Sequence, residues 1–276
     1  VYNRNKINID QMRVIYNSMV NHLTYVKGPP GTGKTETIFN VLLSAYANDK
    51  TVLVCSNNNH PVTDIFNKMD GFLKIRKPYS SEEEKVYFPM IRLGNHQEMV
   101  ETIKKLKEIL SFVSKKSRSH ENDSLTQMSK NKSLSGFKEL KELLIEYESQ
   151  IDLADRIQTL QKIRELTTIT QINTKLDEQI KIYRDKLNSS RVIHDQDVLK
   201  YAISASEDSH FQNYVYYSSL SKLKRLLNDS YRELREIIVL DDLEDAAFKL
   251  AKWIKDDKNL NHLLNVFPLV ICTNLS

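Results

Sequence analysis

The residues with the clearest chemical meaning form one stretch near the N-terminus, Gly28–Thr35, which reads GPPGTGKT. Its spacing, G-x-x-x-x-G-K-T, is typical of loops that bind the phosphates of a nucleotide. Glycines let backbone N–H groups turn toward phosphate oxygens, and a helix that begins at the loop adds its positive end. Lys34 is then expected to reach the β- and γ-phosphates, and the Thr35 hydroxyl to hold Mg²⁺.

The residues on either side of this loop have the pattern that it requires. Leu23–Val26 has the composition of a short buried strand, and apolar residues recur at helical spacing from Glu36 to about Ala47. A strand before the loop and a helix after it favour nucleotide binding over the alternative, a plain Gly/Pro turn. We therefore interpret Gly28–Thr35 as a phosphate-binding loop (P-loop).

Strand-like and helix-like segments alternate further along the chain. Thr51–Asn59 is an apolar run that ends in a polar loop, residues 88–95 are also strand-like, and so is Phe267–Ser276. A helix with one apolar face is expected over about Val62–Met69. This alternation predicts a parallel α/β sheet, in which ligands bind at the carboxyl ends of the strands.

Two further features are candidate binding residues. The loop Ser56–His60 lies at a strand end and is rich in Ser and Asn, which suits contacts with phosphodiester groups, although Asn-rich loops are more often simple turns. Gln11 stands at the start of a short helix that Asp10 is expected to cap, and its amide has the donor and the acceptor that adenine requires. On spacing alone, an ordinary surface glutamine is the favoured interpretation.

The composition limits the class of protein. The 276 residues are 40% hydrophobic and 28% charged, as in a typical soluble protein, and the net charge of +4 is compatible with nucleic-acid binding without showing it. No signal peptide or membrane-spanning apolar run is evident, so we expect a cytoplasmic protein that binds no membrane. Cys55 and Cys272 lie in apolar runs and are expected to be buried free thiols. Because the chain begins with Val1, we also expect it to be part of a longer protein.

Residues 97–262 differ from the rest, because Gly136 is their only glycine or proline. Apolar residues alternate there in steps of three and four, which predicts helices packed in a coiled-coil manner. Residues 114–135 lack this rhythm and are expected to form a mobile linker. We predict a helical insertion over 97–262 that projects from an α/β core formed by 1–96 and 263–276. Later helices within the insertion are expected at about Asp197–Ala205, Tyr214–Val239 and Leu243–Lys255.

The run Ile237–Asp242 offers a second interpretation. It is apolar and ends in two acids, like the strand that carries the Mg²⁺-organising carboxylates after a P-loop (the Walker B element). Asp241 and Asp242 would then serve the metal, as in an AAA+ or signalling-type ATPase. However, the helical spacing of apolar residues continues through Leu234, and no strand-to-loop signal follows. A helix capped by Asp241 or Asp242 is therefore favoured.

Taken together, these motifs resemble the first half of a superfamily 1 helicase. The order is Gln11, GPPGTGKT at Gly28–Thr35, VLVCSNNNHPVTDIFNKM at Val52–Met69, IRLGN at Ile91–Asn95, a long helical segment, and FPLVICTNLS at Phe267–Ser276. These segments make up roughly a third of the chain. They are most similar to the long bacterial members of the branch that includes RNA-surveillance and DNA-replication helicases. The resemblance implies a P-loop NTPase (RecA-like) fold of the α/β class, here a partial parallel sheet with a large all-α, coiled-coil-like insertion.

The resemblance also implies roles for single residues. Gln11 falls at the position of an adenine-reading glutamine, which reverses the interpretation from spacing alone. The residues implied to bind ATP are Gln11, Gly28, Gly31, Thr32, Gly33, Lys34, Thr35 and Glu36, of which Lys34 and Thr35 are catalytic and Thr35 holds Mg²⁺. The residues implied to contact single-stranded DNA or RNA are Ser56, Asn57, Asn58 and Thr273. The insertion falls where these helicases carry an accessory subdomain, and it is a candidate contact for a protein partner.

ATP hydrolysis in this family also requires catalytic groups that these motifs do not contain. It requires an Asp-Glu strand for Mg²⁺ and the attacking water, and a second RecA-like domain whose arginines reach the γ-phosphate. We therefore expect the parent protein to be an ATP-driven helicase or translocase, and this chain alone to bind nucleotide weakly and not to hydrolyse it. Two alternatives remain open: an ATPase that uses Asp241 and Asp242, and a coiled-coil interaction module on a vestigial P-loop fold.

Overall fold

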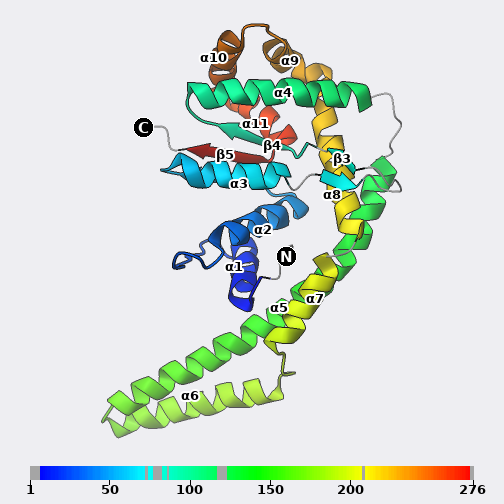
Figure 1. The fold of residues 1–276 in the computed structure, drawn as a ribbon. Helices are drawn as coiled ribbons and strands as arrows, with labels where there is room; N and C mark the ends of the chain where they lie inside the picture. Colours follow the sequence, from blue (N-terminus) through cyan, green and yellow to red (C-terminus); the bar gives the residue numbers. More distant parts are fainter. Residues whose placement is uncertain are drawn as a thin grey trace.

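The central element of the fold is a sheet of three parallel strands (Figure 1). The strands β1 (Val52–Ser56), β4 (Met90–Leu93) and β5 (Leu269–Thr273) lie in the order β1-β5-β4. Val52 of β1 is the register partner of Leu269 in β5. The last of these strands in the sequence therefore lies between the other two. The computed structural model describes residues 7–71, 74–76, 83–85, 87–116, 123–206 and 209–273.

One face of the sheet is covered by α2 (Lys34–Ala47), α3 (Asn59–Gly71) and α8 (Ser209–Lys224). Their buried cluster with the strands includes Phe39, Leu42, Leu43, Val62, Ile65, Met69, Tyr214, Val215, Leu220, Met90, Leu269 and Ile271. The Tyr46 hydroxyl lies 2.9 Å from the Ser218 hydroxyl. Burial raises the pKa of Tyr46 to about 12, so the phenol stays protonated at neutral pH and joins α2 to α8.

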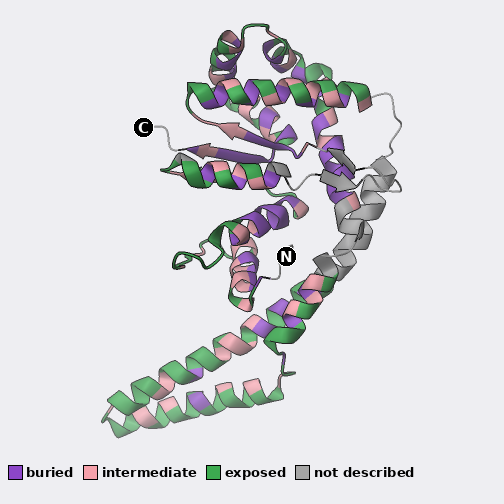
Figure 2. Ribbon diagram, in the orientation of Figure 1, coloured by how far each residue is buried: buried purple, intermediate pink, exposed green. Residues whose placement is uncertain are grey.

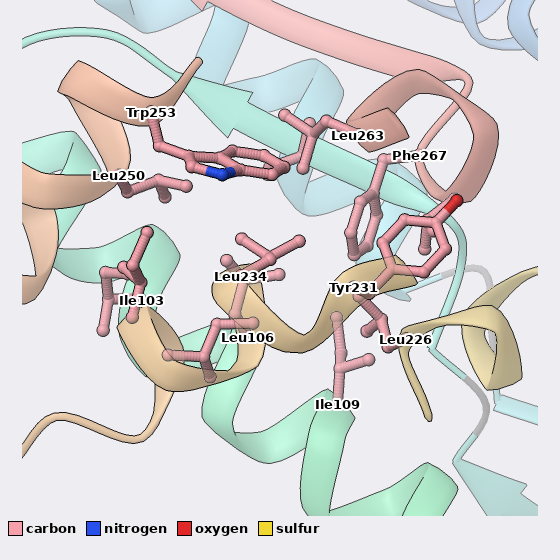
Figure 3. Packing of buried hydrophobic residues seen from close by; sticks show 14 of the residues in the cluster. Ile103, Leu106, Ile109, Leu226, Tyr231, Leu234, Leu250, Trp253, Leu263 and Phe267 are labelled. Carbon is pink, nitrogen blue, oxygen red and sulfur yellow. The ribbon is translucent and has the colours of Figure 1, made fainter. Parts of the chain in front are cut away.

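The opposite face is covered by α4 (His96–Lys116), α9 (Arg232–Ile238), α10 (Leu243–Trp253) and α11 (Asp257–Val266). Figure 3 shows the side chains that converge there: Ile103, Leu106, Ile109, Leu226, Tyr231, Leu234, Leu250, Trp253, Leu263 and Phe267. Ile91 of β4 and Val270 of β5 belong to the same cluster. Because successive side chains of a strand point to opposite faces, β5 supplies both clusters and lies at the centre of a three-layer α/β/α arrangement.

A helical arm extends away from the sheet (Figure 1). It is a hairpin of α5 (Asp123–Leu166) and α6 (Thr170–Ser189), and α7 (Asp195–Ser206) packs on α5 near its base. Most of the hairpin side chains that the structure describes are exposed (Figure 2), and the buried ones toward its tip include Ile157 and Ile180. Although α5 is long, no helix in the described ranges has both the length and the apolar character that crossing a membrane requires.

The first helix, α1 (Ile9–Val20), packs against both α2 and the base of the arm. Its buried side chains share one cluster with α5, α7 and the segment that precedes α7. The cluster includes Ile7, Met12, Ile15, Tyr16, Leu140, Leu144, Tyr147, Ile193, Val198 and Ala202. The base of the arm thus packs on the helix that precedes the P-loop, and α5 also packs along α8.

This architecture confirms the predicted fold class, a partial parallel α/β sheet with a large helical insertion. The strand-like segments at 51–59, 88–95 and 267–276 contain β1, β4 and β5. Residues 274–276 lie outside the described residues. The division of the chain at 96 and 263 remains a prediction. In the structure, α4 and α9–α11 cover the sheet, whereas α5–α7 form the arm.

One predicted strand, Leu23–Val26, is not a strand in the structure. The side chains of Leu23 and Tyr25 are 86% and 85% exposed. A strand needs a neighbour to bind its N–H and C=O groups, and no strand of the described sheets pairs with this segment. The prediction was wrong because an apolar composition can indicate a strand without supplying its partner.

The helical region differs from the prediction in two places. Residues 114–116 end α4 and residues 123–135 begin α5 in place of a linker, while 117–122 lie outside the described residues. The single helix expected over 214–239 is divided by two 3₁₀ turns, η1 (Arg225–Leu227) and η2 (Asp229–Tyr231). The Arg235 guanidinium donates to the Leu226 carbonyl at 2.6 Å, which stabilises the break.

Three elements were not predicted. An antiparallel pair, β2 (Lys74–Arg76) and β3 (Glu83–Lys85), lies between two of the predicted strand segments, where the sequence analysis proposed no strand. The helix α11 begins after Asp256, whose carboxylate accepts hydrogen bonds from the backbone N–H groups of Lys258 and Asn259. An Asp before a short apolar pattern is the signal that could have identified α11.

The structure excludes the interpretation of Ile237–Leu240 as a Walker B strand. Ile237 and Ile238 are the last residues of α9, and both are buried on its inner face. The Asp242 carboxylate accepts a hydrogen bond from the Glu244 N–H at 2.9 Å, so Asp242 is the N-cap of α10. The helical interpretation, with an aspartate cap, is confirmed.

A pair of leucine substitutions tests the described core. Leu106 is 1% exposed and Leu166, at the end of α5, is 86% exposed. We expect Leu106→Ala to lower the free energy of unfolding by about 2–5 kcal/mol, because it leaves a cavity between α4 and α9. We expect Leu166→Ala to change it by less than about 0.5 kcal/mol. Urea unfolding followed by circular dichroism measures both values, and equal effects would contradict this packing.

Candidate nucleotide and nucleic-acid site

The P-loop has the backbone geometry that its glycines predict. Gly31 and Gly33 have φ angles of 82° and 76°, in the left-handed region that glycine adopts without strain. Gly33 is also the N-cap residue of α2, so the helix begins at Lys34. The positive end of α2 therefore lies directly at the loop, which is the geometry that attracts phosphate.

Lys34 and Thr35 are both exposed at this helix end. The Lys34 ammonium donates to the carbonyl oxygens of Gly28 and Pro29, at 2.7 and 2.9 Å. The Thr32 hydroxyl donates to the same Pro29 carbonyl at 2.8 Å. The Lys34 ammonium thus binds the backbone of its own loop. It can exchange these two carbonyls for phosphate oxygens, which would accept stronger, charge-assisted hydrogen bonds.

Gln11 holds this loop from outside. Its side-chain amide donates to the Thr32 carbonyl at 2.7 Å. Its side-chain oxygen accepts from the Asn8 N–H at 3.0 Å, and the Asn8 side chain accepts from the Gln11 N–H at 2.9 Å. Asn8, and not Asp10 as predicted, is therefore the N-cap of α1, in a capping box. A side chain at Gly33 would place its Cβ 2.5 Å from the Gln11 amide nitrogen, so this contact requires glycine.

Glu36 lies in the first turn of α2, and its carboxylate forms an ion pair with Lys68 of α3. The Lys68 ammonium also lies 5.8 Å from the centre of the Phe39 ring. Glu36 therefore joins the P-loop helix to α3 in this structure. Its predicted contact with the nucleotide remains a prediction.

The predicted nucleic-acid residues lie at the carboxyl ends of β1 and β5. Ser56 ends β1, and its hydroxyl accepts from the Asn58 N–H at 3.2 Å, which turns the chain toward α3. Asn57 and Asn58 are exposed. Thr273 is buried instead, and its hydroxyl donates to the Glu98 carboxylate at 3.2 Å. The structure thus brings together two exposed amides and one buried hydroxyl.

Glu98 is a site residue that the sequence analysis missed. Its carboxylate accepts from the Asn95 N–H at 3.1 Å, and the Asn95 side chain accepts from the Glu98 N–H at 3.0 Å, which is a second capping box, at the start of α4. The same carboxylate forms an ion pair with Arg92 at the end of β4. The spacing N-x-x-E at 95–98 is the signal that could have identified it. Glu98 therefore joins the ends of β4 and β5.

The site is also connected to the arm. The Arg13 guanidinium of α1 donates to the Glu148 carboxylate of α5 at 2.7 Å. This hydrogen bond raises the pKa of Arg13. At the same contact, burial together with the hydrogen bond to Asp195 raises the pKa of Tyr147 to about 12. The ion pair of Arg13 with Glu148 therefore holds α1 against α5, and the hydrogen bond of Tyr147 with Asp195 joins α5 to α7.

The polar groups at the P-loop suit a nucleotide with bound Mg²⁺ better than a metal ion alone. In the described ranges, His, Cys, Asp and Glu do not gather in groups of three or more that could hold a metal. Mg²⁺ usually binds through one or two protein ligands together with phosphate oxygens. The exposed Thr35 hydroxyl, beside Lys34 and the positive end of α2, fits that mode.

Comparison with known proteins identifies the family. Residues 6–276 match the family model AAA_11, described as an AAA domain. The chain belongs to this family. Its membership, together with the helicases described below, confirms the resemblance to superfamily 1 helicases. No solved structure matches the chain.

Three curated relatives are helicases by name. The chain is 28% identical over 103 residues to DNA polymerase alpha-associated DNA helicase A of Schizosaccharomyces pombe, covering 37% of the chain and 14% of that protein. It is 40% identical over 50 residues to an uncharacterized ATP-dependent helicase of Mycoplasma genitalium, covering 18% of the chain and 4% of that protein. It is 35% identical over 65 residues to the homologue from Mycoplasma pneumoniae, covering 22% of the chain and 6% of that protein. The matched part of this chain thus spans a small fraction of each relative.

The contact between Gln11 and the P-loop can be tested by Gln11→Glu. Glutamate retains the acceptor of the capping box, but it loses the donor to the Thr32 carbonyl. We expect the affinity for a fluorescent ATP analogue to fall roughly two- to tenfold, which corresponds to the loss of one hydrogen bond. Gln158→Glu, which makes the same change at an exposed position of the arm, should leave the affinity unchanged. Equal affinities of the wild type and Gln11→Glu would show that the contact does not support the loop.

Proposed function

We propose that this chain is the ATP-binding part of an ATP-dependent helicase or translocase, which couples ATP hydrolysis to movement on single-stranded DNA or RNA. The observation that carries the proposal is the P-loop at the start of α2, with Lys34 and Thr35 exposed at the positive helix end. The family and the names of the relatives support it. A cytoplasmic location remains a prediction.

In this proposal the loop binds ATP with Mg²⁺. Backbone N–H groups of Gly31–Thr35 and the end of α2 would hold the phosphates, and Lys34 would exchange the Gly28 and Pro29 carbonyls for oxygens of the β- and γ-phosphates. Thr35 would hold Mg²⁺, and the ion would neutralise charge on the phosphates. Gln11 holds the loop through the Thr32 carbonyl, and its amide would have to leave that carbonyl to take the adenine-reading role that the family resemblance implies.

The nucleic-acid contact in this proposal lies at the carboxyl edge of the sheet. Ser56 ends β1 and Asn57 and Asn58 follow it; these residues contact the sugar-phosphate backbone, where neutral amides and N–H groups are suitable donors. Thr273 contributes from the end of β5, and its hydroxyl must release Glu98 to reach a phosphate. Such contacts carry no sequence information, which suits a motor that moves along any strand.

Hydrolysis in this proposal requires groups beyond the described P-loop. A carboxylate pair for Mg²⁺ and the attacking water, and arginines from a second RecA-like domain of the same protein, complete the site as the family resemblance implies. The arm, which exposes Leu166 and Ile169 at its end, is a candidate contact for a protein partner. Those parts and partners belong to the proposal for the whole protein.

The nucleotide part of the proposal is tested by Lys34→Ala. We expect this substitution to lower the affinity for a fluorescent ATP analogue at least roughly tenfold, because it removes a charge-assisted contact with the phosphates. Lys181→Ala, at an exposed position of the arm, is the matched control and should bind like the wild type. If both variants bind like the wild type, Lys34 does not contribute to nucleotide binding.

The chain alone is expected to show no steady-state ATPase activity, because the P-loop supplies only part of the catalytic set. Phosphate release from the purified chain, with and without single-stranded oligonucleotide, measures this directly. If the wild type hydrolyses ATP and Lys34→Ala does not, the claim that the catalytic set is incomplete is refuted. The same result would support the P-loop as an ATP site.

The nucleic-acid part is tested by Asn58→Asp, with Asn188→Asp on the arm as the control of equal charge change. Fluorescence anisotropy with a labelled single-stranded oligonucleotide should show weaker binding for Asn58→Asp only, because the new carboxylate repels phosphates. Wild-type affinity should fall as the salt concentration rises, since binding releases counterions. Equal weakening in both variants would indicate an effect of net charge and not of this loop.

A further inference from the structure

Two cysteines face each other at the carboxyl edge of the sheet. Cys55 of β1 and Cys272 of β5 are register partners in the parallel pair, and their sulfur atoms are 3.1 Å apart. Each cysteine stands directly before a residue of the proposed nucleic-acid site, Ser56 or Thr273. The sequence prediction that both thiols are buried was wrong, since Cys55 is exposed and Cys272 is partly exposed.

The exposure has a simple structural cause. Along β1, Leu53 and Cys55 point to the same face, because side chains alternate between the two faces of a strand. On this face the helices α4 and α9–α11 cover Val270 of β5. They do not cover its register partner in β1, Leu53, which is 63% exposed. The face of β1 is thus open at this edge, and a small molecule can reach Cys55.

The two thiols differ in reactivity. Burial raises the pKa of the Cys272 thiol to about 11, and the hydrogen bond with Cys55 and the charge of Glu98 act in the same direction. Cys272 is therefore a poor nucleophile on its own at neutral pH, because the thiolate is the reactive form. Cys55 is the thiol that solvent reagents meet first.

We propose that Cys55 and Cys272 are a reversible redox modification site that closes to an intramolecular disulfide by exchange with a low-molecular-weight disulfide. The Cys55 thiolate attacks one sulfur of the small disulfide, forms a mixed disulfide and releases one small thiolate. Cys272 gives up its proton and attacks the Cys55 sulfur, which forms the Cys55–Cys272 bond and releases the second small thiolate. Two protein thiols are oxidised and one small disulfide is reduced to two thiols.

The backbone already satisfies the requirement for this bond. Neighbouring strands of a sheet lie roughly 4.8 Å apart, and disulfides join residues whose Cα atoms are about 4.4–6.8 Å apart. The register pairing of Cys55 with Cys272 therefore allows closure through side-chain rotation, without a shift of either strand. The adjacent pair gives the first mixed disulfide a nearby resolving thiol, which a lone surface cysteine does not have.

The bond would connect parts of the chain that are far apart in the sequence. Cys55 and Cys272 are 217 positions apart, so closure restricts the unfolded chain strongly. It would also link the ends of β1 and β5 that carry Ser56 and Thr273. The oxidised protein is therefore expected to unfold at a higher temperature than the reduced protein.

The experiment uses the whole chain with glutathione disulfide as the probe. Intact-mass analysis should show the loss of two hydrogen atoms, peptide mapping should find one Cys55–Cys272 link, and dithiothreitol should reverse both. The unfolding midpoint should rise by at least about 3 °C on oxidation. Two free thiols after prolonged exposure, or only disulfides between chains, would overturn the proposal.

Two single substitutions separate the steps. Cys272→Ser should stop at a stable adduct of one glutathione on Cys55, because the resolving thiol is absent. Cys55→Ser should react much more slowly, because Cys272 is shielded. Equal rates of adduct formation in the two variants would contradict the assigned order. Lys34→Ala should close like the wild type, so this test is independent of the nucleotide site.

Discussion

The constraint on which the structure depends is the insertion of β5 between β1 and β4. Val52–Ser56 and Met90–Leu93 do not pair with each other, and both find their hydrogen-bond partners in Leu269–Thr273. A parallel strand pair cannot be joined by a tight turn, so the chain between β4 and β5 must leave the sheet and return to it. That return path contains α4, the arm and α8–α11, and it supplies the helices that cover one face of the sheet and part of the other.

Two helix starts position the polar groups of the candidate site. At the start of α1, the capping box of Asn8 and Gln11 leaves the Gln11 amide free to donate to the P-loop. At the start of α4, the capping box of Asn95 and Glu98 leaves the Glu98 carboxylate in contact with Arg92 and Thr273. In both cases one side chain satisfies a helix N-terminus and also reaches a neighbouring element. A local rule of helix capping thereby contributes to tertiary geometry.

The arm and the P-loop share a structural neighbour, the helix α1. Its apolar face belongs to the cluster of Leu140, Leu144 and Val198, and its Arg13 forms an ion pair with Glu148 of the arm. Its first turn contacts Thr32 of the loop. A shift of α1 would therefore change its contacts with both the arm and the P-loop, because packed helices move as rigid elements. The arm is attached to the body at this contact and where α5 packs along α8.

The sequence by itself determined the motif chemistry and most local elements. The spacing of GPPGTGKT predicted the glycine conformations and the helix that begins at Lys34, and hydrophobic periodicity predicted β1, β4, β5 and most helices, because these depend on neighbouring residues. Only the tertiary structure decided which segments pair. It left Leu23–Val26 without a strand partner, placed Asp242 at a helix start, engaged Thr273 with Glu98 and brought Cys55 against Cys272. These outcomes depend on residues far apart in the chain, whose proximity is set by packing and strand order and not by local pattern.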